Sequence, residues 1–497
     1  MTRPLAHSCL KLPGMIITTI AIMASMTISS IAYSATLLVI ASDKKCSHNS
    51  ASSGTATSNG YCTIQSAIND ASDKDIIKIP AGIYVETLDI SKSVTLVGDT
   101  SSPSIIDAQK KGSVIQIQPG NKVTIKNLTI VNGYAQTGGG IHNQGSLMLV
   151  NSEIKNNTAF QSGGGIYNAG SISGSLYISN SKIINNKAQG DDKFNVKYGG
   201  GGIYNNSPLN ISNSTISNNK SVDNGGGIYS IYAGRKAPSD SQLIAEQIGL
   251  ATAPTRRSTL NRKSDIGSVL LHKTVISHNI AGSGGGINLQ GVMTVKKSLI
   301  HNNKAINHKR SAGGGIFSHL DSILHISNTS ISKNEAKFRG AGIRFYSTKT
   351  GTLDNVSIIH NNLTTKFGQG AGLYLEKHTR FFSIQNSVIS ENTIAHVTPS
   401  DCAGNIQSAG YNFIGSIKRC SWLKESGDII SDTKKIDPGL YFKADEDRYY
   451  ISKNSPLINN GSPAGCLDHT KKILKKDQLG NSRTIDRCDI GAIEHKN

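Results

Sequence analysis

The sequence has few of the residues from which wide globular cores are built. Of 497 residues, 37% are hydrophobic and 5% aromatic, with a single Trp. Length alone suggests about three domains of roughly 150 residues, but this composition cannot fill three such cores. Charged residues (17%) and Pro (12) are also scarce, which argues against a disordered polyelectrolyte. These shortages leave an ordered fold with a narrow core.

Glycine and asparagine are abundant instead, at 51 and 42 residues, and they predict many turns, as in a repeat solenoid. The formal charge is +19, and removal of the leader described next leaves +17. Such a surface favours polyanions, whether nucleic acid, acidic polysaccharide or an anionic membrane face. A basic surface that serves only solubility is the alternative.

The N-terminus reads as a secretory signal peptide over residues 1–34. Arg3 and Lys11 precede an apolar stretch from Met15 to Ala32, and small residues at Ala32 and Ser34 suit a signal peptidase. A retained anchor helix is the alternative. We therefore expect a secreted or cell-surface protein, with the periplasm as a further possibility, and nucleic acid is disfavoured as a partner.

Without Cys9 of the leader, six cysteines remain, and none lies between Cys62 and Cys402. Because a rigid rod would separate the two groups, we expect local disulfides, which suit an oxidising compartment. The expected pairs are Cys46 with Cys62, Cys402 with Cys420, and Cys466 with Cys488. No spacing indicates a metal site, and we expect no cofactor.

Two motifs recur along the chain. A Gly-Gly-Gly-Ile motif or a variant of it ends at Ile141, Ile166, Ile203, Ile228, Ile287, Ile316, Ile343 and Leu373. Between these, a second motif such as Ile211-Ser-Asn213-Ser-Thr-Ile216-Ser-Asn-Asn219 repeats eight times, ending at Asn157, Asn186, Asn219, Asn279, Asn303, Asn334, Asn361 and Asn392. Short alternating strands punctuated by Asn and Gly are predicted.

Asparagine tolerates the left-handed backbone region, so Asn213 and its equivalents are expected to turn the chain. We expect them to stack into an internal amide ladder that breaks at Lys273 and Lys297. The ladder residues are Asn127, Asn151, Asn180, Asn213, Asn328, Asn355 and Asn386.

These repeats predict an all-β fold, a right-handed parallel β-helix, since ankyrin and tetratricopeptide units require helix-forming stretches that are missing here. Solenoid ends need caps. Residues 35–100 are expected to hold an N-terminal cap, helical from Cys62 to Ala71, and the first coils. Residues 101–400 are assigned to the β-helix repeats with an insert at about 233–267, and residues 401–497 to a disulfide-bearing C-terminal cap.

The segment from Cys62 to Gly82 resembles the opening of secreted pectin-lyase-fold proteins, and the repeats over 138–392 are similar to those of polymorphic outer-membrane proteins. The C-terminal region resembles the choice-of-anchor Q domain of bacterial surface proteins. The matching segments are Gly410-Tyr-Asn-Phe-Ile-Gly415, Asp437-Pro-Gly-Leu440, Ser455-Pro-Leu-Ile-Asn-Asn-Gly461, Asp477-Gln-Leu-Gly480 and Cys488-Asp-Ile-Gly-Ala-Ile-Glu494. Together these resemblances imply an exported bacterial β-helix protein.

Polymorphic outer-membrane proteins end in a membrane barrel. Here the chain stops three residues after Glu494, and we expect no integral membrane barrel.

The residues that glycan cleavage requires are scarce in this sequence. Hydrolysis needs two converging carboxylates, and the repeats are poor in acids. Lyase chemistry needs Ca²⁺ carboxylates and a base, for which Arg344 is a weak candidate with His360 and His378 in the same half. A solvated Arg344 is the alternative. Gly82 to Glu86 matches the opening motif of pectin methylesterases, without that family's later motifs.

A binding role fits the sequence pattern better than a catalytic role does. After each inward Ile or Leu, the outward position should form one exposed stripe. Its members are His142, Tyr167, Tyr204, Tyr229, Asn288, Phe317, Arg344 and Tyr374. The expected ligand-binding residues among them are Tyr167, Tyr204, Tyr229, Phe317, Arg344 and Tyr374. Aromatic faces suit sugars and a basic surround suits acidic ones. Rings that only stabilise the sheet are the alternative.

The basic insert at about 233–267 is a second candidate binding site. A disordered insertion without a function is the alternative. The sequence thus predicts an exported, non-catalytic protein in surface binding or adhesion, with an acidic polysaccharide or a host or cell-surface component as partner. A polysaccharide lyase or hydrolase acting on uronate polymers is the alternative.

Overall fold

The computed structural model describes residues 34–40, 60–169, 174–190, 199–231, 268–306, 311–432, 436–483 and 487–495. Cys46, the insert at about 233–267 and all of the expected signal peptide except Ser34 lie outside these residues. Among the described residues, no helix has the length and apolar composition needed to cross a membrane.

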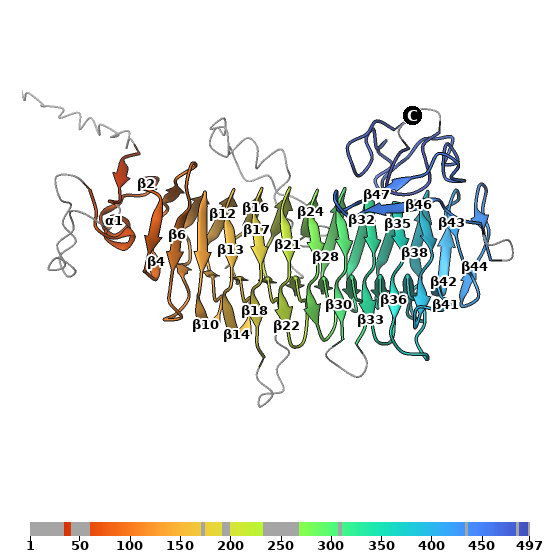
Figure 1. Cartoon of the computed structure of the whole chain (residues 1–497), viewed down its shortest axis with the longest axis horizontal. Helices are drawn as coiled ribbons and strands as arrows, with labels where there is room; N and C mark the ends of the chain where they lie inside the picture. The colour runs from red at the N-terminus through yellow and green to blue at the C-terminus, as the bar shows by residue number, and fades with distance from the viewer. Residues whose placement is uncertain are drawn as a thin grey trace, which may run out of the picture.

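The chain winds into a rod of stacked coils (Figure 1), and each full coil lays four strands in the same order onto four stacks, which we call I to IV. Within a stack, each strand pairs in parallel with its counterpart in the next coil, as Ile166 pairs with Ile203 and Ile203 with Ile228. This arrangement confirms the all-β parallel β-helix that the sequence predicts.

The strands fall into the four stacks as follows. Stack I contains β4 (Leu88–Ile90), β7 (Ile115–Ile117), β11 (Ile141–Asn143), β15 (Ile166–Asn168), β19 (Ile203–Asn205), β23 (Ile228–Ser230), β27 (Ile287–Leu289), β31 (Ile316–Ser318), β34 (Ile343–Phe345) and β37 (Leu373–Leu375). Stack II contains β1 (Thr36–Leu38), β2 (Ile76–Ile79), β5 (Thr95–Gly98), β8 (Lys122–Lys126), β12 (Ser146–Val150), β16 (Leu176–Ser179), β20 (Leu209–Ser212), β24 (Ser268–His272), β28 (Val292–Lys296) and β38 (Phe381–Gln385).

Stack III contains β3 (Gly82–Tyr84), β6 (Ser104–Asp107), β9 (Leu128–Val131), β13 (Glu153–Lys155), β17 (Lys182–Ile184), β21 (Thr215–Ser217), β25 (Val275–Ser277), β29 (Leu299–His301), β39 (Val388–Ser390), β43 (Phe413–Ile414) and β45 (Ile429–Ile430). The long strands β32 (Ile323–Ser332) and β35 (Thr350–Ile359) pass through both II and III. Stack IV contains β10 (Tyr134–Thr137), β14 (Thr158–Ser162), β18 (Lys187–Ala188), β22 (Lys220–Ser221), β26 (Ile280–Ala281), β30 (Lys304–Ala305), β33 (Glu335–Ala336), β36 (Asn362–Leu363) and β40 (Thr393–Ile394), with β41 (Thr398–Pro399) antiparallel at its end.

The core is a set of apolar rows that run the length of the rod. Strand alternation turns every second side chain inward, and the inward position of each coil lies directly over that of the previous coil. The isoleucines that end the glycine motif are fully buried, and so is the stack III row of Ile154, Ile183, Ile216, Ile276, Ile300 and Ile331. One narrow core therefore replaces the three domains that length suggests.

The last glycine of each Gly-Gly-Gly-Ile motif is needed because two coils approach closely there. A Cβ on Gly227 would lie 2.7 Å from the carbonyl oxygen of Gly286 and 3.1 Å from the Nδ2 atom of Asn279. No larger residue fits without displacing the next coil.

The N-terminal end is capped by helix α1 (Ile64–Asp70), as the sequence predicts. Thr63 begins the helix by accepting a hydrogen bond from the Ser66 amide at 3.0 Å. Ile64, Ala67 and Ile68 bury one face of the helix in the core.

The asparagine ladder is present but uses a different residue of the motif from the one we expected. Its members are the buried asparagines that end the motif, and each Nδ2 atom donates to the Oδ1 atom of the next member at 2.8–3.1 Å. The ladder runs Asn157, Asn186, Asn219, Asn279, Asn303, Asn334, Asn361, Asn392 and ends on Asp401. A shorter ladder links Asn143, Asn168 and Asn205 at 2.7 Å in stack I.

The expected ladder residues instead lie at the corner between stacks II and III, with φ between 46° and 59°. Their predicted role in turning the chain is confirmed, but the corner points their side chains away from the core. Asn151, Asn180 and Asn213 are exposed and Asn127 is half-exposed, whereas Asn328, Asn355 and Asn386 are covered by the C-terminal segment. Lys273 and Lys297 occupy the same corner, with φ of 50° and 51°.

The rod ends with β42 (Cys402–Ser408) and β44 (Cys420–Trp422), which are joined by the predicted Cys402–Cys420 disulfide. The predicted Cys466–Cys488 disulfide is also formed. Cys62 is disulfide-bonded, and its expected partner Cys46 lies outside the described residues.

Residues 436–495, which we call the C-terminal module, fold back onto the flank of the rod (Figure 1). The module contains an antiparallel hairpin of β46 (Leu440–Lys443) and β47 (Arg448–Ile451). Its apolar side chains, including Tyr449, Leu457 and Ile490, pack against Ile359 and Val388 of the coils. The module therefore shares its core with the rod.

Candidate functional site

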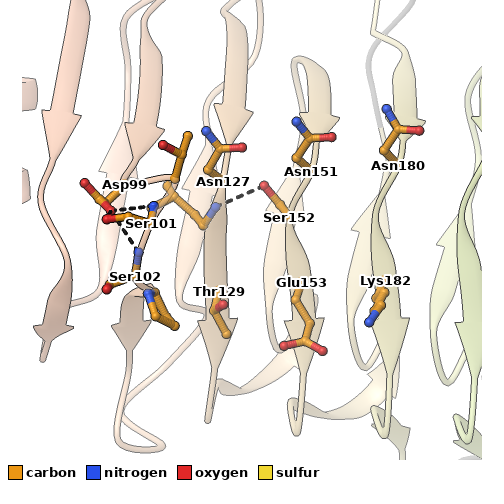
Figure 2. Close-up of a pocket in the computed structure, with 13 residues that line it drawn as sticks. Asp99, Ser101, Ser102, Asn127, Thr129, Asn151, Ser152, Glu153, Asn180 and Lys182 are labelled. Carbon is orange, nitrogen blue, oxygen red and sulfur yellow. Dashed lines mark hydrogen bonds between the residues drawn. The ribbon is translucent and has the colours of Figure 1, made fainter.

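One corner of the rod carries a continuous line of outward side chains, which we call the corner row. It contains Asn127, Asn151, Asn180, Asn213, Lys273, Lys297, Asn328, Asn355 and Asn386, one from each of nine consecutive coils. The left-handed conformation at each corner aims the side chains in a common direction, as Figure 2 shows for three of them.

The first three residues of the corner row border a groove of about 600 Å³. Figure 2 shows Asn127, Asn151 and Asn180 along one side and Thr129, Glu153 and Lys182 along the other. The groove is closed at one end by the loop after Asp99, whose carboxylate accepts hydrogen bonds from the amides of Ser101 (2.8 Å) and Ser102 (2.9 Å). The hydroxyl of Ser101 also donates to this carboxylate at 2.6 Å, and this bond, followed by the two amide bonds, lowers the pKa of Asp99, so the carboxylate stays charged.

A group of lysines lies where the corner row meets the module, and we call it the lysine patch. It contains Lys273 and Lys297 of the coils and Lys471, Lys472, Lys475 and Lys476 of the module. All are exposed except Lys297, which is half-buried. The carbonyl of Lys476 accepts a hydrogen bond from Asn328 (2.8 Å), and that of Leu467 accepts one from Asn355 (3.0 Å), which places the lysine-bearing turn over the coils next to Lys297.

The acidic group that acts on Lys297, Asp477, is buried rather than on the surface of the lysine patch. No ion pair joins the six ammonium groups of the patch to a carboxylate of the described residues, while nearby Asp468 pairs with Lys296 at 3.4 Å. Burial, and then the like charge of Lys273, lower the pKa of Lys297. The patch thus concentrates positive charge at its surface, as an anion-binding surface does.

Sequence reasoning missed this patch. The Lys471-Lys472-Ile-Leu-Lys475-Lys476 run is visible in the sequence, but no local pattern shows that it lies beside Lys273 and Lys297, about 180–200 residues earlier in the chain.

The outward stripe on stack I is in register, as expected. His142 pairs with Tyr167, Tyr167 with Tyr204, and Tyr204 with Tyr229 in successive coils, and the line continues through Asn288, Phe317, Arg344 and Tyr374. The rings of Tyr167 and Tyr204 are stacked 4.7 Å apart, and Tyr204 meets Tyr229 edge to face at 5.7 Å.

The tyrosines of the stripe therefore cover one another's faces, which leaves mainly ring edges and hydroxyl groups for a ligand. Burial raises the pKa of Tyr167, Tyr204 and Tyr229, so these hydroxyls stay neutral and can donate hydrogen bonds. Phe317 and Tyr374 are buried. This geometry favours the alternative role, in which the rings stabilise the sheet and do not bind a ligand.

Arg344, the weak catalytic candidate, is held in a structural cluster. Its guanidinium donates to the Glu376 carboxylate at 2.6 Å and lies 4.7 Å from the centroid of the Phe317 ring. Arg339 pairs with the same carboxylate at 3.1 Å. His378 packs against Tyr346, and His360 pairs with Glu391 at 2.8 Å. The structure thus does not bring Arg344 and His360 into one cluster.

One trio of side chains in the described residues, Cys466, Cys488 and Glu494, brings ligand-type atoms within 4.8 Å of one another. The cysteines form a disulfide, and Glu494 accepts from buried Arg483. This trio is therefore structural.

No family model and no curated protein matches the chain. Among solved structures, the chain is similar to one described as the crystal structure of pectate lyase Pel9A, with a TM-score of 0.45 and 14% identity over 93% of this chain and 97% of that chain. The resemblances of the repeats to polymorphic outer-membrane proteins and of residues 401–497 to the choice-of-anchor Q domain stay predictions.

Proposed function

We propose that this is an exported, non-catalytic β-helix protein that binds an acidic glycan at the cell exterior, and that the lysine patch is the binding surface. The observation that carries the proposal is that Lys273, Lys297 and the lysine-bearing turn at Lys476 come together from two distant parts of the chain, and that no salt bridge joins the lysines of the patch to a carboxylate of the described residues. The patch needs no cofactor for this role.

The arrangement of charge supports a polymer as the ligand. Lys273 and Lys297 lie on adjacent coils, about 5 Å apart along the rod axis, and the module turn extends the charge across Asn328 and Asn355. A polyuronate presents carboxylates at regular intervals and can contact several lysines at once. The exposed amide of Asn213, on the coil before Lys273, offers a hydrogen bond to a sugar hydroxyl.

The acidic groups near the lysine patch are buried and do not lie on its surface. Asp354 and Asp468 are buried beneath it. Burial, reinforced by Asp468, raises the pKa of Asp354 to about 7, so this carboxyl is partly protonated near neutral pH. An anionic ligand therefore meets little repulsion.

The test is binding of polygalacturonate to the full chain, with neutral dextran as the reference polymer. Lys273→Gln with Lys297→Gln should weaken polygalacturonate binding about tenfold or more, since two charges contribute on the order of 1.4 kcal/mol. The matched control is Lys187→Gln with Lys220→Gln, which removes two exposed lysines that pair across adjacent coils in stack IV. Equal losses in the two double variants, or no loss in either, would contradict the proposal.

The same assay examines the other two hypotheses. Binding through the aromatic stripe predicts a loss with Tyr167→Ala plus Tyr204→Ala, and the lysine patch proposal predicts none. A lyase or hydrolase predicts new unsaturated or reducing ends that disappear with Arg344→Ala. Either result would redirect the assignment to stack I.

A further inference from the structure

The covered part of the corner row shows what this surface binds within the molecule. Asn328 and Asn355 donate through Nδ2 to the carbonyls of Lys476 (2.8 Å) and Leu467 (3.0 Å). Asn386 accepts through Oδ1 from the amide of Ser462 at 2.8 Å. Three consecutive corner amides thus each bind a backbone group of the module.

A second row of the same surface acts with the corner amides. On stack III, Ser330 donates to the side chain of Gln478 at 2.5 Å, and Ser357 accepts from the amide of Ala492 at 3.1 Å. Corner amides and stack III hydroxyls together form a two-row polar track on which a polypeptide lies.

Two coils interrupt the track, with Lys273 and Lys297 at the corner and Val275 and Leu299 in the second row. Asparagine corners resume along the N-terminal coils, where no described residue covers them. Asn127, Asn151, Asn180 and Asn213 share the φ range of the covered asparagines. The second row there runs from Thr129 through Glu153 and Lys182 to Thr215, in direct register with Ser330 and Ser357 farther along the rod. The groove in Figure 2 lies along the first three of these coils, beside Asn127, Asn151 and Asn180.

We infer that the open track docks an extended polypeptide segment of a partner protein, with its backbone amides and carbonyls bound by Asn127, Asn151, Asn180 and Asn213. The support for this inference is that asparagines in the same corner conformation hold polypeptide backbone a few coils away, on the far side of the two coils that carry Lys273 and Lys297. Four coils span about 14 Å, which matches four or five residues of extended chain.

The charge of the groove separates this ligand from the acidic glycan proposed above. The groove presents the carboxylates of Asp99 and Glu153 and one ammonium group, Lys182, and Glu153 already pairs with Lys155 at 2.6 Å. A polyanion gains little there, whereas a polypeptide backbone is neutral and its side chains can suit either sign. The two sites therefore differ in charge and meet at Asn213, which lies at the border between them.

The experiment selects linear peptides from a displayed library on the full chain and measures their affinity for two double variants. Asn151→Gly with Asn180→Gly removes two track amides, and glycine keeps the left-handed backbone without strain. The matched control is Asn156→Gly with Asn185→Gly, which changes two exposed asparagines with φ of 58° and 57° at the next corner of the same coils.

We expect selected peptides to lose about tenfold or more in affinity for the track variant and to retain it for the control. Peptides should also protect the Asn151 and Asn180 side-chain amides in NMR spectra, a readout that does not depend on stability. The inference is overturned if no peptide shows this dependence, if both variants bind equally weakly, or if only oligosaccharides depend on the track amides. Binding that falls with Lys273→Gln plus Lys297→Gln and not with the track variant would also overturn it.

Discussion

Asparagine has two roles in each coil, and backbone geometry decides which one a given residue takes. At the corner, the left-handed conformation turns the chain and directs the amide outward. At the end of the motif, the amide points inward and bonds the coils above and below. Asn213 and Asn219 are six residues apart and differ in this way, so their substitutions should differ greatly in cost.

Asn219→Ala should strongly destabilise the rod. Its Oδ1 atom accepts from the backbone and side-chain amides of Asn186 (2.9 and 3.1 Å), and its Nδ2 atom donates to the Ile183 carbonyl (2.8 Å). Each buried group left without a partner costs about 1–3 kcal/mol, so we expect a loss of at least about 3 kcal/mol in urea unfolding. Asn213→Gly should change stability by less than about 1 kcal/mol. Similar losses for the two variants would contradict the assigned roles.

Asp354 should make stability depend on pH. Its pKa is raised to about 7 by burial and by Asp468, and its Oδ2 atom has no hydrogen-bond partner among the described residues. A raised folded-state pKa gives stability at low pH that is lost as the pH rises through about 7. Asp354→Asn should therefore gain stability over the natural chain between pH 5 and 8, by up to about 1.4 kcal/mol for each pKa unit of the shift. A difference in melting temperature that is constant with pH would contradict this.

At the scale of strands and ladders, much of the structure could be predicted from the repeats. Alternating isoleucines and the glycine motif fix where each strand lies, and the short spacing between cysteines predicts the two disulfides seen. The ladder was assigned to the wrong asparagine because both asparagines of the motif recur with the same period. Periodicity alone does not show which of them faces inward.

The stripe on stack I should act mainly on stability. Tyr204 is packed between Tyr167 and Tyr229. Tyr204→Ala should lower the free energy of unfolding by about 1–3 kcal/mol because it removes packing on both sides, and Tyr204→Phe should retain most of it. Thermal unfolding checks both. Unchanged stability together with lost polygalacturonate binding would show instead that the stripe binds ligand.

At the scale of the whole molecule, the position of the C-terminal module is the feature that could not be predicted from the sequence. The hydrogen bond from Asn328 to Lys476 joins residues 148 apart, and no local pattern marks such a contact. The lysine patch and the covered part of the track both follow from this docking. The sequence alone therefore does not predict the two candidate sites, because their positions depend on this long-range contact.

Arg483 should be essential for keeping the module on the rod. It is fully buried, pairs with Glu494, and donates to Asn328 at 2.7 Å and to the Gly491 carbonyl at 2.8 Å. Arg483→Met leaves Glu494 buried without its cation, which costs about 3–5 kcal/mol. We expect faster hydrogen exchange in residues 455–495 and in the coils around Asn328.

Adding Glu494→Leu to Arg483→Met removes the unpaired charge and should recover part of the stability. Exchange that stays slow in the single variant would show that apolar packing alone holds the module.

The buried ladder also bears on how such a chain can change in evolution. Asn219 bonds both Asn186 and Asn279, although 33 residues separate one pair and 60 the other. The intervening length does not matter to the bond, provided that each coil returns one asparagine to the same place. After duplication or loss of an entire coil, the two coils that become neighbours would therefore still form the ladder hydrogen bond. A deletion of two or three residues within a coil would displace the asparagine and break this bond. We therefore expect the length of such a rod to change in whole coils, and the loops between strands to tolerate insertions.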